Sequence, residues 1–130
     1  MSRHKDYRNK RKILGLCGHS GCQNKRNGYY CDAHKAFHNA RLNRLYHERE
    51  RKIITAYGGC CNKCGEARFG CLELDHVNDD GNIHRRELGC TGGPKLQQWI
   101  IKNNYPNTLQ LLCANCHRLK HYKAQYGTES

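Results

Sequence analysis

Residues 107–121 read NTLQLLCANCHRLKH, a short apolar run followed by a Cys-x2-Cys-His motif. A second segment, residues 72–81, reads LELDHVNDDG, in which apolar and polar residues alternate up to an Asp-His pair. Alternation of this kind is typical of strands that bury one face. The predicted elements are strands at 72–77 and 109–112 and a helix at 115–123. The two segments therefore predict a strand pair followed by a helix, with Asp75 and His76 where the first strand ends.

A pair of Cys-x2-Cys motifs flanks the Asp-His segment. Each motif can place two thiolates on one tetrahedral ion at about 2.3 Å, so the pair predicts a structural zinc site. Its expected ligands are Cys61, Cys64, Cys113 and Cys116. The 48 residues between the motifs exceed ordinary zinc-ribbon spacing, which predicts a functional element inserted between them. Cys60 is an alternative to Cys61, and ordinary buried thiols are the alternative to zinc.

Three further cysteines and a histidine form a candidate zinc site nearer the N-terminus. Its expected ligands are Cys17, Cys22, Cys31 and His34. Three thiolates and an imidazole suit four-coordinate zinc, and the ion would clamp the N-terminal segment to the helix that begins near His34. His19 is a competing ligand. Three cysteines remain outside both sites and are expected as small buried apolar residues: Cys60, Cys71 and Cys90.

The apolar content of the chain is low, with 37% hydrophobic residues among 130 and a mean hydropathy of −0.97. Such chains bury little apolar area and usually need staples. The basic N-terminus runs into only a short apolar patch at 13–16, so we expect no signal peptide, and no apolar run reaches the roughly 18 residues of a membrane span. A reducing cytoplasm is therefore expected, where metal ligation is favoured over disulfides.

The charge of the chain favours a polyanionic partner. Lys and Arg outnumber Asp and Glu by 23 to 11, which gives a net charge of +12 and an isoelectric point near 9.4. An excess of this size on a small protein is typical of nucleic-acid binding. The alternative is a basic surface that only aids solubility. Residues 1–12 carry much of the excess without apolar periodicity, so we expect an unstructured arm that could follow a phosphate backbone or insert in a minor groove. The alternative is a solvated tail without a partner.

Two further helices are predicted from local pattern. Residues 33–57 contain no Pro or Gly and are followed by Gly58 and Gly59, which predicts a long helix with a glycine stop. Its expected apolar stripe comprises Leu42, Leu45, Tyr46, Ile53 and Tyr57. A shorter helix is expected at 95–103, entered through Pro94.

The strand ending in Asp-His, with a second strand and a helix that carries Cys-x2-Cys-His, resembles the ββα-metal motif of HNH endonucleases. The wider pattern includes AYGGCCNKCGE at 56–66 and GNIHRREL at 81–88, and it is similar to small HNH nucleases often encoded by phages. The resemblance covers roughly residues 17–121. It implies a phosphodiester hydrolase acting in the cytoplasm of a bacterial or phage-infected cell.

This resemblance implies roles for three residues. Phosphodiester hydrolysis needs an activated water, charge stabilisation on the phosphate and help for the leaving 3′ oxygen. His76 is expected as the general base, while Asp75, on the other strand face, and His117 would hold one catalytic divalent ion, Mg²⁺ or Mn²⁺. The alternatives are a polar strand end for Asp75 and His76, and a zinc-ligand role for His117 in place of a cysteine.

The remaining site predictions are less sharply defined by the motif. The family's middle Asn usually lies directly before the second strand, where this chain has Thr108, so Asn107 is the candidate brace and an ordinary turn Asn is the alternative. Candidates for neutralising DNA phosphates are Arg85, Arg86, Arg118, Lys120 and His121. All of these side chains could instead be merely solvated. His84 is a further candidate for contacting substrate.

The expected fold class is a small α+β, zinc-stapled protein with a ββα-metal (HNH) core, an N-terminal zinc knuckle and a long connecting helix. The expected parts are a basic arm at 1–16, the zinc knuckle at 17–34, the connecting helix at 35–57, the nuclease domain at 58–124 and a tail at 125–130.

The expected function is a metal-dependent endonuclease that nicks or cleaves double-stranded DNA and leaves a 5′ phosphate and a 3′ hydroxyl. Its expected cofactors are two structural Zn²⁺ ions and one catalytic Mg²⁺ or Mn²⁺. A homodimer would be needed for symmetric double-strand cutting, because one such site handles one strand at a time. The alternatives are a non-catalytic zinc DNA-binding module, which has no need of Asp75 and His76, and a zinc-held adaptor that joins a larger complex through its long helix.

Overall fold

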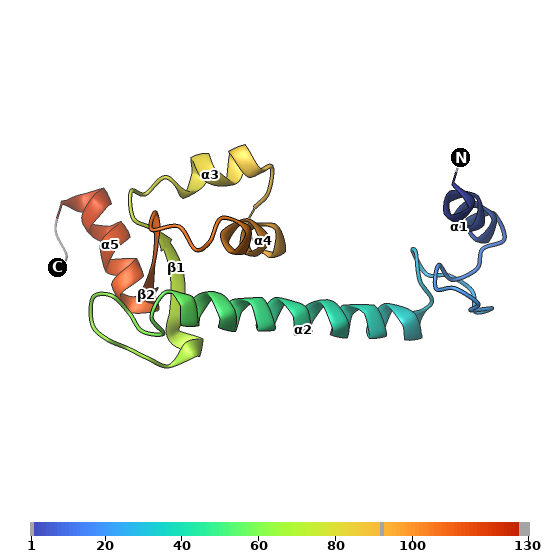
Figure 1. Ribbon diagram of the computed structural model, residues 1–130, viewed down its shortest axis with the longest axis horizontal. Coiled ribbons are helices and arrows are strands. Elements are labelled where there is room, and N and C mark those ends of the chain that lie inside the picture. The colour runs from blue at the N-terminus through green and yellow to red at the C-terminus, as the bar shows by residue number, and fades with distance from the viewer. Residues whose placement is uncertain (1, 92, 128–130) are drawn as a thin grey trace. The chain divides into compact units, whose positions relative to one another are not determined.

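The computed structural model describes residues 2–91 and 93–127, which form a small α+β structure of five α-helices and one two-stranded sheet (Figure 1). The chain divides into two compact units, residues 1–45 and residues 46–130. Helix α2, Asp32–Ala56, runs from the first unit into the second. No helix in the described part of the chain is both long and apolar enough to cross a membrane.

The first unit contains helix α1, Arg3–Ile13, where an unstructured arm was expected. The arm has no apolar stripe, but the buried guanidinium of Arg11 holds the helix against the following loop. Its Nε atom donates to the carbonyl oxygen of Cys17 at 2.8 Å, and Nη2 donates to that of Cys22. The prediction of disorder was wrong because a buried arginine, which has no periodic signature, replaces the missing apolar face.

Helix α2 confirms the predicted long helix, which was placed at 33–57. Gly58 and Gly59 follow it with φ values of 100° and 71°, and Gly59 N–H donates to the carbonyl oxygen of Ile54, so the glycines end the helix as expected. Only the last turns of the predicted apolar stripe are buried. Ile53 is 1% exposed, whereas Leu42 is 61% exposed.

The two predicted strands form an antiparallel pair in the second unit. Strand β1, Leu72–His76, follows the short 3-10 helix η1, Phe69–Cys71, and pairs with β2, Leu109–Cys113. The register places Asp75 opposite Gln110. Helix α5, Ala114–Tyr126, starts directly after β2 and lies against both strands, as Figure 1 shows. Residues 128–130 of the expected tail lie outside the described residues.

The core of the second unit joins this sheet to the end of α2. Leu111 and Ile100 are fully buried, and Ile53 and Ile54 pack into the same two apolar clusters. Helix α4, Pro94–Lys102, has its proline in the first turn and delivers Ile100, close to the predicted range of 95–103. Helix α3, Gly81–Leu88, was not predicted, because its eight residues are fewer than the roughly 11 over which helical periodicity can be judged.

Candidate functional site

The first cysteine cluster has the spacing that one zinc ion requires. The donor atoms of Cys17, Cys22, Cys31 and His34 all lie within 4.8 Å of one another. Tetrahedral zinc with Zn–S bonds of about 2.3 Å separates its sulfurs by about 3.8 Å, and the Sγ atoms of Cys22 and Cys31 are 3.9 Å apart. The His34 Nδ1 atom lies 3.6 Å and 3.3 Å from the sulfurs of Cys17 and Cys31. The cluster can therefore hold zinc without rearrangement.

Hydrogen bonds around this cluster favour a charged thiolate at Cys31, whereas the pKa of Cys22 is raised by burial and by its sulfur neighbours. Backbone hydrogen bonding at His34 lowers the pKa of Cys31 to about 6, although burial acts in the opposite direction. The backbone N–H of His19 points to the Cys17 sulfur at 3.4 Å. The His19 ring stacks on His34 at 3.9 Å between centroids and is not a member of the four-atom donor set. His34, rather than His19, thus completes the cluster.

The second cluster joins the loop after α2 to the start of α5. Its four sulfurs lie within 4.8 Å of one another, and those of Cys64 and Cys113 are 3.6 Å apart, which fits tetrahedral zinc. Burial raises the pKa of the Cys61 thiol, but the backbone amides that donate to its sulfur together outweigh this effect and lower the pKa to about 6. The pKa values of Cys64 and Cys116 are raised, chiefly by their sulfur neighbours. The cluster members are Cys61, Cys64, Cys113 and Cys116.

The other three cysteines lie outside both clusters. Cys60, Cys71 and Cys90 are free thiols, and each is half-buried rather than buried as expected. Cys60 does not replace Cys61, because only Cys61 belongs to the donor set. The spacing CNKCG therefore identified the correct member of the Cys-Cys pair.

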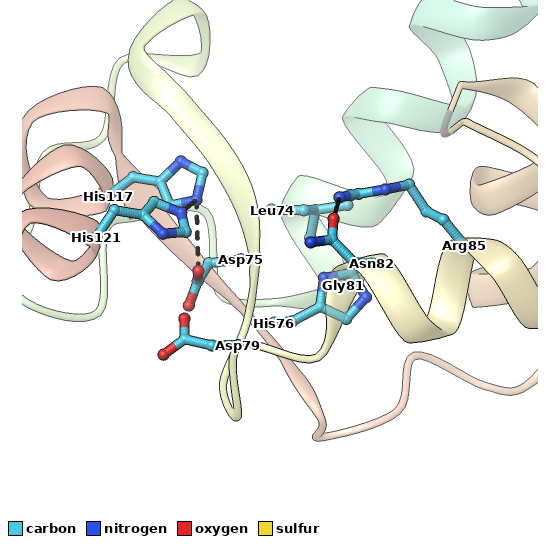
Figure 2. A pocket seen from close by; sticks show the side chains of 9 residues that line it. All are labelled: Leu74, Asp75, His76, Asp79, Gly81, Asn82, Arg85, His117 and His121. Atoms are coloured by element: carbon cyan, nitrogen blue, oxygen red, sulfur yellow. Dashed lines mark hydrogen bonds and ion pairs between the residues drawn. The ribbon is translucent and has the colours of Figure 1, made fainter. Parts of the chain in front are cut away.

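A third group of possible ligands lies where β1 faces α5. The carboxylate of Asp75 and the imidazoles of His117 and His121 offer donor atoms within 4.8 Å of one another. The His117 Nε2 atom is 3.4 Å from Asp75 Oδ1 and 3.0 Å from His121 Nε2. Ligand bonds of about 2.0–2.2 Å place neighbouring donors about 3.0 to 3.5 Å apart, so this group fits one ion. Figure 2 shows the three side chains pointing toward one another.

Neighbouring side chains orient this group. Glu73, two residues before Asp75 on the same strand face, lies 2.5 Å from Nδ1 of His117, so a proton on Nδ1 leaves the Nε2 lone pair available to a metal ion. Gln110 and Lys120 both donate to Oδ2 of Asp75, at 2.8 Å and 2.6 Å. These contacts leave Oδ1 as the carboxylate oxygen nearest His117. Asp75 is only 2% exposed, and the ammonium of Lys120 offsets the cost of burying its charge.

His76 occupies the opposite face of β1, because successive strand residues alternate. Its Nε2 atom lies 2.9 Å from Nδ1 of His84 on α3. Burial lowers the pKa of His76 below its usual value, and the nearby His84 acts in the same direction, so the ring is neutral at pH 7. A Cβ atom on Gly81 would lie 2.9 Å from His76 Nδ1, so glycine at this position makes room for the ring. In Figure 2 the ring turns toward Gly81 and Arg85.

One cavity reaches both faces of the strand end. Its volume is about 190 Å³, compared with about 30 Å³ for a water molecule in the liquid, so it has room for a phosphate group and several waters. Its lining residues are Leu74, Asp75, His76, Asp79, Gly81, Asn82, Arg85, His117 and His121. Asp79 adopts a left-handed backbone conformation (φ 56°) in the turn after β1 and pairs with Lys120 at 3.0 Å.

The other predicted site residues occupy varied surroundings. Asn107 is exposed before β2, and Thr108 makes the contact behind β1, since its carbonyl oxygen accepts from Val77 N–H. Arg85 reaches the cavity and donates to Asn82 at 2.9 Å. Arg86 and Arg118 are exposed. Lys120 is held within the protein by Asp75, by Asp79 and by two backbone carbonyls. Partial burial lowers its pKa, but the hydrogen bonds and charges of Asp75 and Asp79 outweigh this effect and raise it.

Three residues of the site occupy positions that were not predicted from the sequence: Glu73, His84 and His121. Glu73 could have been found from its i, i+2 spacing to Asp75, whereas the contact of His84 with His76 depends on the unpredicted helix α3. His121 was expected beside DNA phosphates, and it lies one helical turn after His117 in the ligand group. No protein-family model, curated protein or solved structure matches this chain. What the site can do therefore follows from its own donor atoms.

Proposed function

We propose that this protein is a metal-dependent endonuclease of the HNH (ββα-metal) type that hydrolyses phosphodiester bonds in double-stranded DNA. The observation that carries the proposal is the pairing of two chemistries at one strand end. A three-residue ligand group lies on one face of β1, and a neutral histidine lies on the other face beside the same cavity. A non-catalytic DNA-binding module has no use for this pairing.

The arrangement of β1, β2 and α5 supports the ββα-metal assignment. Two members of the second cysteine cluster, Cys113 and Cys116, lie at the start of α5, and His117 is the next residue on that helix. A zinc ion in that cluster would fix the start of α5, and hence the position of His117 relative to Asp75. The structural site would therefore set the geometry of the catalytic one.

The residues of the ligand group fit a divalent cation. Such an ion, when bound, would polarise the scissile phosphate and stabilise the leaving 3′ oxygen. Three protein ligands leave positions open for substrate and water. Two imidazoles and one carboxylate suit Mn²⁺ and other transition ions better than Mg²⁺, which prefers oxygen ligands. His121 thus shifts the proposed preference toward Mn²⁺.

His76 would act as the general base. A neutral imidazole can accept the proton of the attacking water, and the lowered pKa of His76 keeps it neutral at physiological pH. Arg85 lies on the same side of the cavity and would meet a phosphate oxygen with its guanidinium. Lys120 would serve a different purpose, since it holds Asp75 in place and compensates its charge.

Plasmid nicking tests the proposal directly. Zinc-loaded protein incubated with supercoiled plasmid is expected to produce nicked circles before linear DNA, because one site cuts one strand. Mn²⁺ should support nicking at a lower concentration than Mg²⁺. His76→Ala protein purified in the same way controls for contaminating nucleases. Absence of nicking across Mn²⁺, Mg²⁺, Co²⁺, Ni²⁺ and Zn²⁺ would reject the nuclease in favour of a binding module.

A further inference from the structure

The positive charge of the chain is concentrated in the first unit. Residues 1–45 carry eleven Lys and Arg against two Asp, whereas residues 46–130 carry twelve Lys and Arg against nine Asp and Glu. The first unit therefore holds nine of the twelve net positive charges. Zinc in the clusters would widen this difference, since one ion with three thiolates has a net charge of −1 and one with four thiolates has −2.

The second unit has little electrostatic attraction for DNA near its cavity. Glu73, Asp75 and Asp79 surround the ligand group, and Lys120 is already paired with two of them. Of the described residues that line the cavity, Asp75 and Asp79 carry carboxylates, and Arg85 is the one Lys or Arg that could meet a phosphate there. The affinity of the whole protein for DNA therefore has to come largely from elsewhere.

Helix α1 presents cations in an ordered array. Lys5, Arg8 and Lys12 are exposed, and their spacing of three and four places them along one side of the helix. Arg11 attaches the helix to the rest of the first unit: its side chain is 6% exposed and donates a hydrogen bond to the loop of the first cysteine cluster. Tyr7 adds a second contact, because its hydroxyl accepts from Gly21 N–H at 3.3 Å.

We infer that α1 is a DNA-anchoring surface that binds the phosphate backbone of the substrate duplex, while the second unit contributes cutting. The inference rests on the proposed function for the identity of the nucleic acid. An ordered helix loses less conformational entropy on binding than a disordered arm with the same charges. The first zinc site would then serve substrate binding, by holding α1 through Arg11.

Salt-dependent binding tests this inference with matched variants of the full chain. The background is His76→Ala without added divalent cation, which keeps the DNA intact. The α1 variant combines Lys5→Ala, Arg8→Ala and Lys12→Ala. The control variant removes three exposed cations of the second unit: Lys95→Ala, Lys102→Ala and Lys123→Ala. Fluorescence anisotropy with a labelled duplex gives Kd over a range of salt concentrations.

The α1 variant is expected to bind roughly 10- to 100-fold more weakly near 0.15 M salt, with a salt slope smaller by about 2 to 3, since each phosphate contact contributes about 0.9. The control variant should change Kd by less than about 3-fold. Equal losses in both variants, or binding to anionic vesicles in place of DNA, would overturn the inference. Zinc content and Tm verify that α1 variants fold. If wild-type protein binds DNA through α1 but never nicks it, only the proposed function fails.

The rings of His84 and His76 are in direct contact, and this contact supports a second inference that is independent of α1. His84 Nδ1 lies 2.9 Å from His76 Nε2, so exactly one of these nitrogens carries the shared proton in the neutral pair. His84 Nε2 is buried and meets no hydrogen-bond partner in the part of the chain that the structure describes. The His84 ring also contacts Trp99, with 4.1 Å between centroids.

The geometry points to His84 as a positioning residue that accepts a hydrogen bond from Nε2–H of His76. This direction leaves Nδ1 of His76 unprotonated beside Gly81, which lines the cavity. It also places the second proton of the neutral pair on His84 Nε2, in a ring that packs against Trp99. The inference rests on the proposed function, because a fixed tautomer matters only if His76 accepts a proton.

Two substitutions separate this role from simple packing. The amide oxygen of His84→Asn can replace Nδ1 as the acceptor, whereas His84→Leu fills space without one. We expect ¹⁵N spectra of the His76 ring to show Nε2–H in wild type and His84→Asn, and a mixture in His84→Leu. Nicking by His84→Leu should fall about 10- to 100-fold with unchanged DNA affinity, while His84→Asn retains most activity.

A wild-type His76 protonated on Nδ1, or a leucine variant with normal tautomer and rate, would overturn the second inference. The spectra need neither DNA nor a catalytic ion. They decide the hydrogen-bond direction even if wild-type protein fails to nick, so failure of the proposed function remains distinguishable. Should His84→Leu fail to fold, the wild-type and asparagine spectra still provide the test.

Discussion

His76→Ala is expected to lower the rate of plasmid nicking by about 10²- to 10⁴-fold, the range for loss of a general base. The fold should survive, because His76 is half-buried at the end of β1 and its removal opens space toward a cavity rather than in the core. The ligand group lies on the other strand face and keeps all three side chains. Metal and DNA affinities should therefore stay close to those of the wild type.

Single-turnover nicking at saturating Mn²⁺ measures this effect, with Kd for DNA and Tm measured in parallel. His47→Ala is the matched control, since His47 is an exposed histidine of α2 that pairs with Glu50 away from the cavity. The control should cut at the wild-type rate. If the His76 variant also retained full activity, another group would have to take the proton from water, and the role given to His76 would be wrong.

Cys113→Ser is expected to remove one of two zinc ions and to unfold the tertiary structure of the second unit. Cys113 is buried, ends β2 and precedes α5, so its sulfur links the sheet, the helix and the loop at Cys61. Structural zinc in small domains contributes apparent binding energies of about 10–16 kcal/mol, which is comparable to the whole stability of such a domain. The free energy lost with one zinc ligand should therefore be larger than the stability that the small apolar core provides.

Metal analysis and near-ultraviolet circular dichroism measure the outcome. The variant should retain the zinc of the first cluster, and nicking should be lost with the fold. Cys60→Ser is the control, because Cys60 adjoins Cys61 but lies outside the donor set. Its zinc content should stay at two ions per chain. An unchanged zinc content and Tm in Cys113→Ser would show that the second cluster is not a structural metal site.

Elements with a local signature could be predicted from the sequence. The strand pair and α5 follow from alternation and from the position of the cysteines, and α2 follows from a long stretch without helix breakers. The two cysteine clusters follow from ligand type and spacing. The helices and strands show a pattern over neighbouring residues, and the clusters show the ligand types and spacing that zinc requires. Both kinds of feature can be recognised in a single sequence.

Features that depend on tertiary contacts could not be predicted. The helical state of α1 depends on Arg11 reaching backbone carbonyls that belong to a separate loop. The contact between His76 and His84 depends on a helix too short to leave a period. His121 was recognised as a functional candidate, but its position beside His117 Nε2 rather than toward solvent phosphates needed the three-dimensional arrangement.

The adjacency of Asp75 and His76 in a strand with a two-residue repeat has a consequence for how this chain can evolve. Loss or gain of one residue earlier in β1 would turn the carboxylate toward α3 and the imidazole toward α5, exchanging the two faces at once. Insertions and deletions should therefore accumulate in the loop at 65–68, before η1, and be rare in residues 72–76.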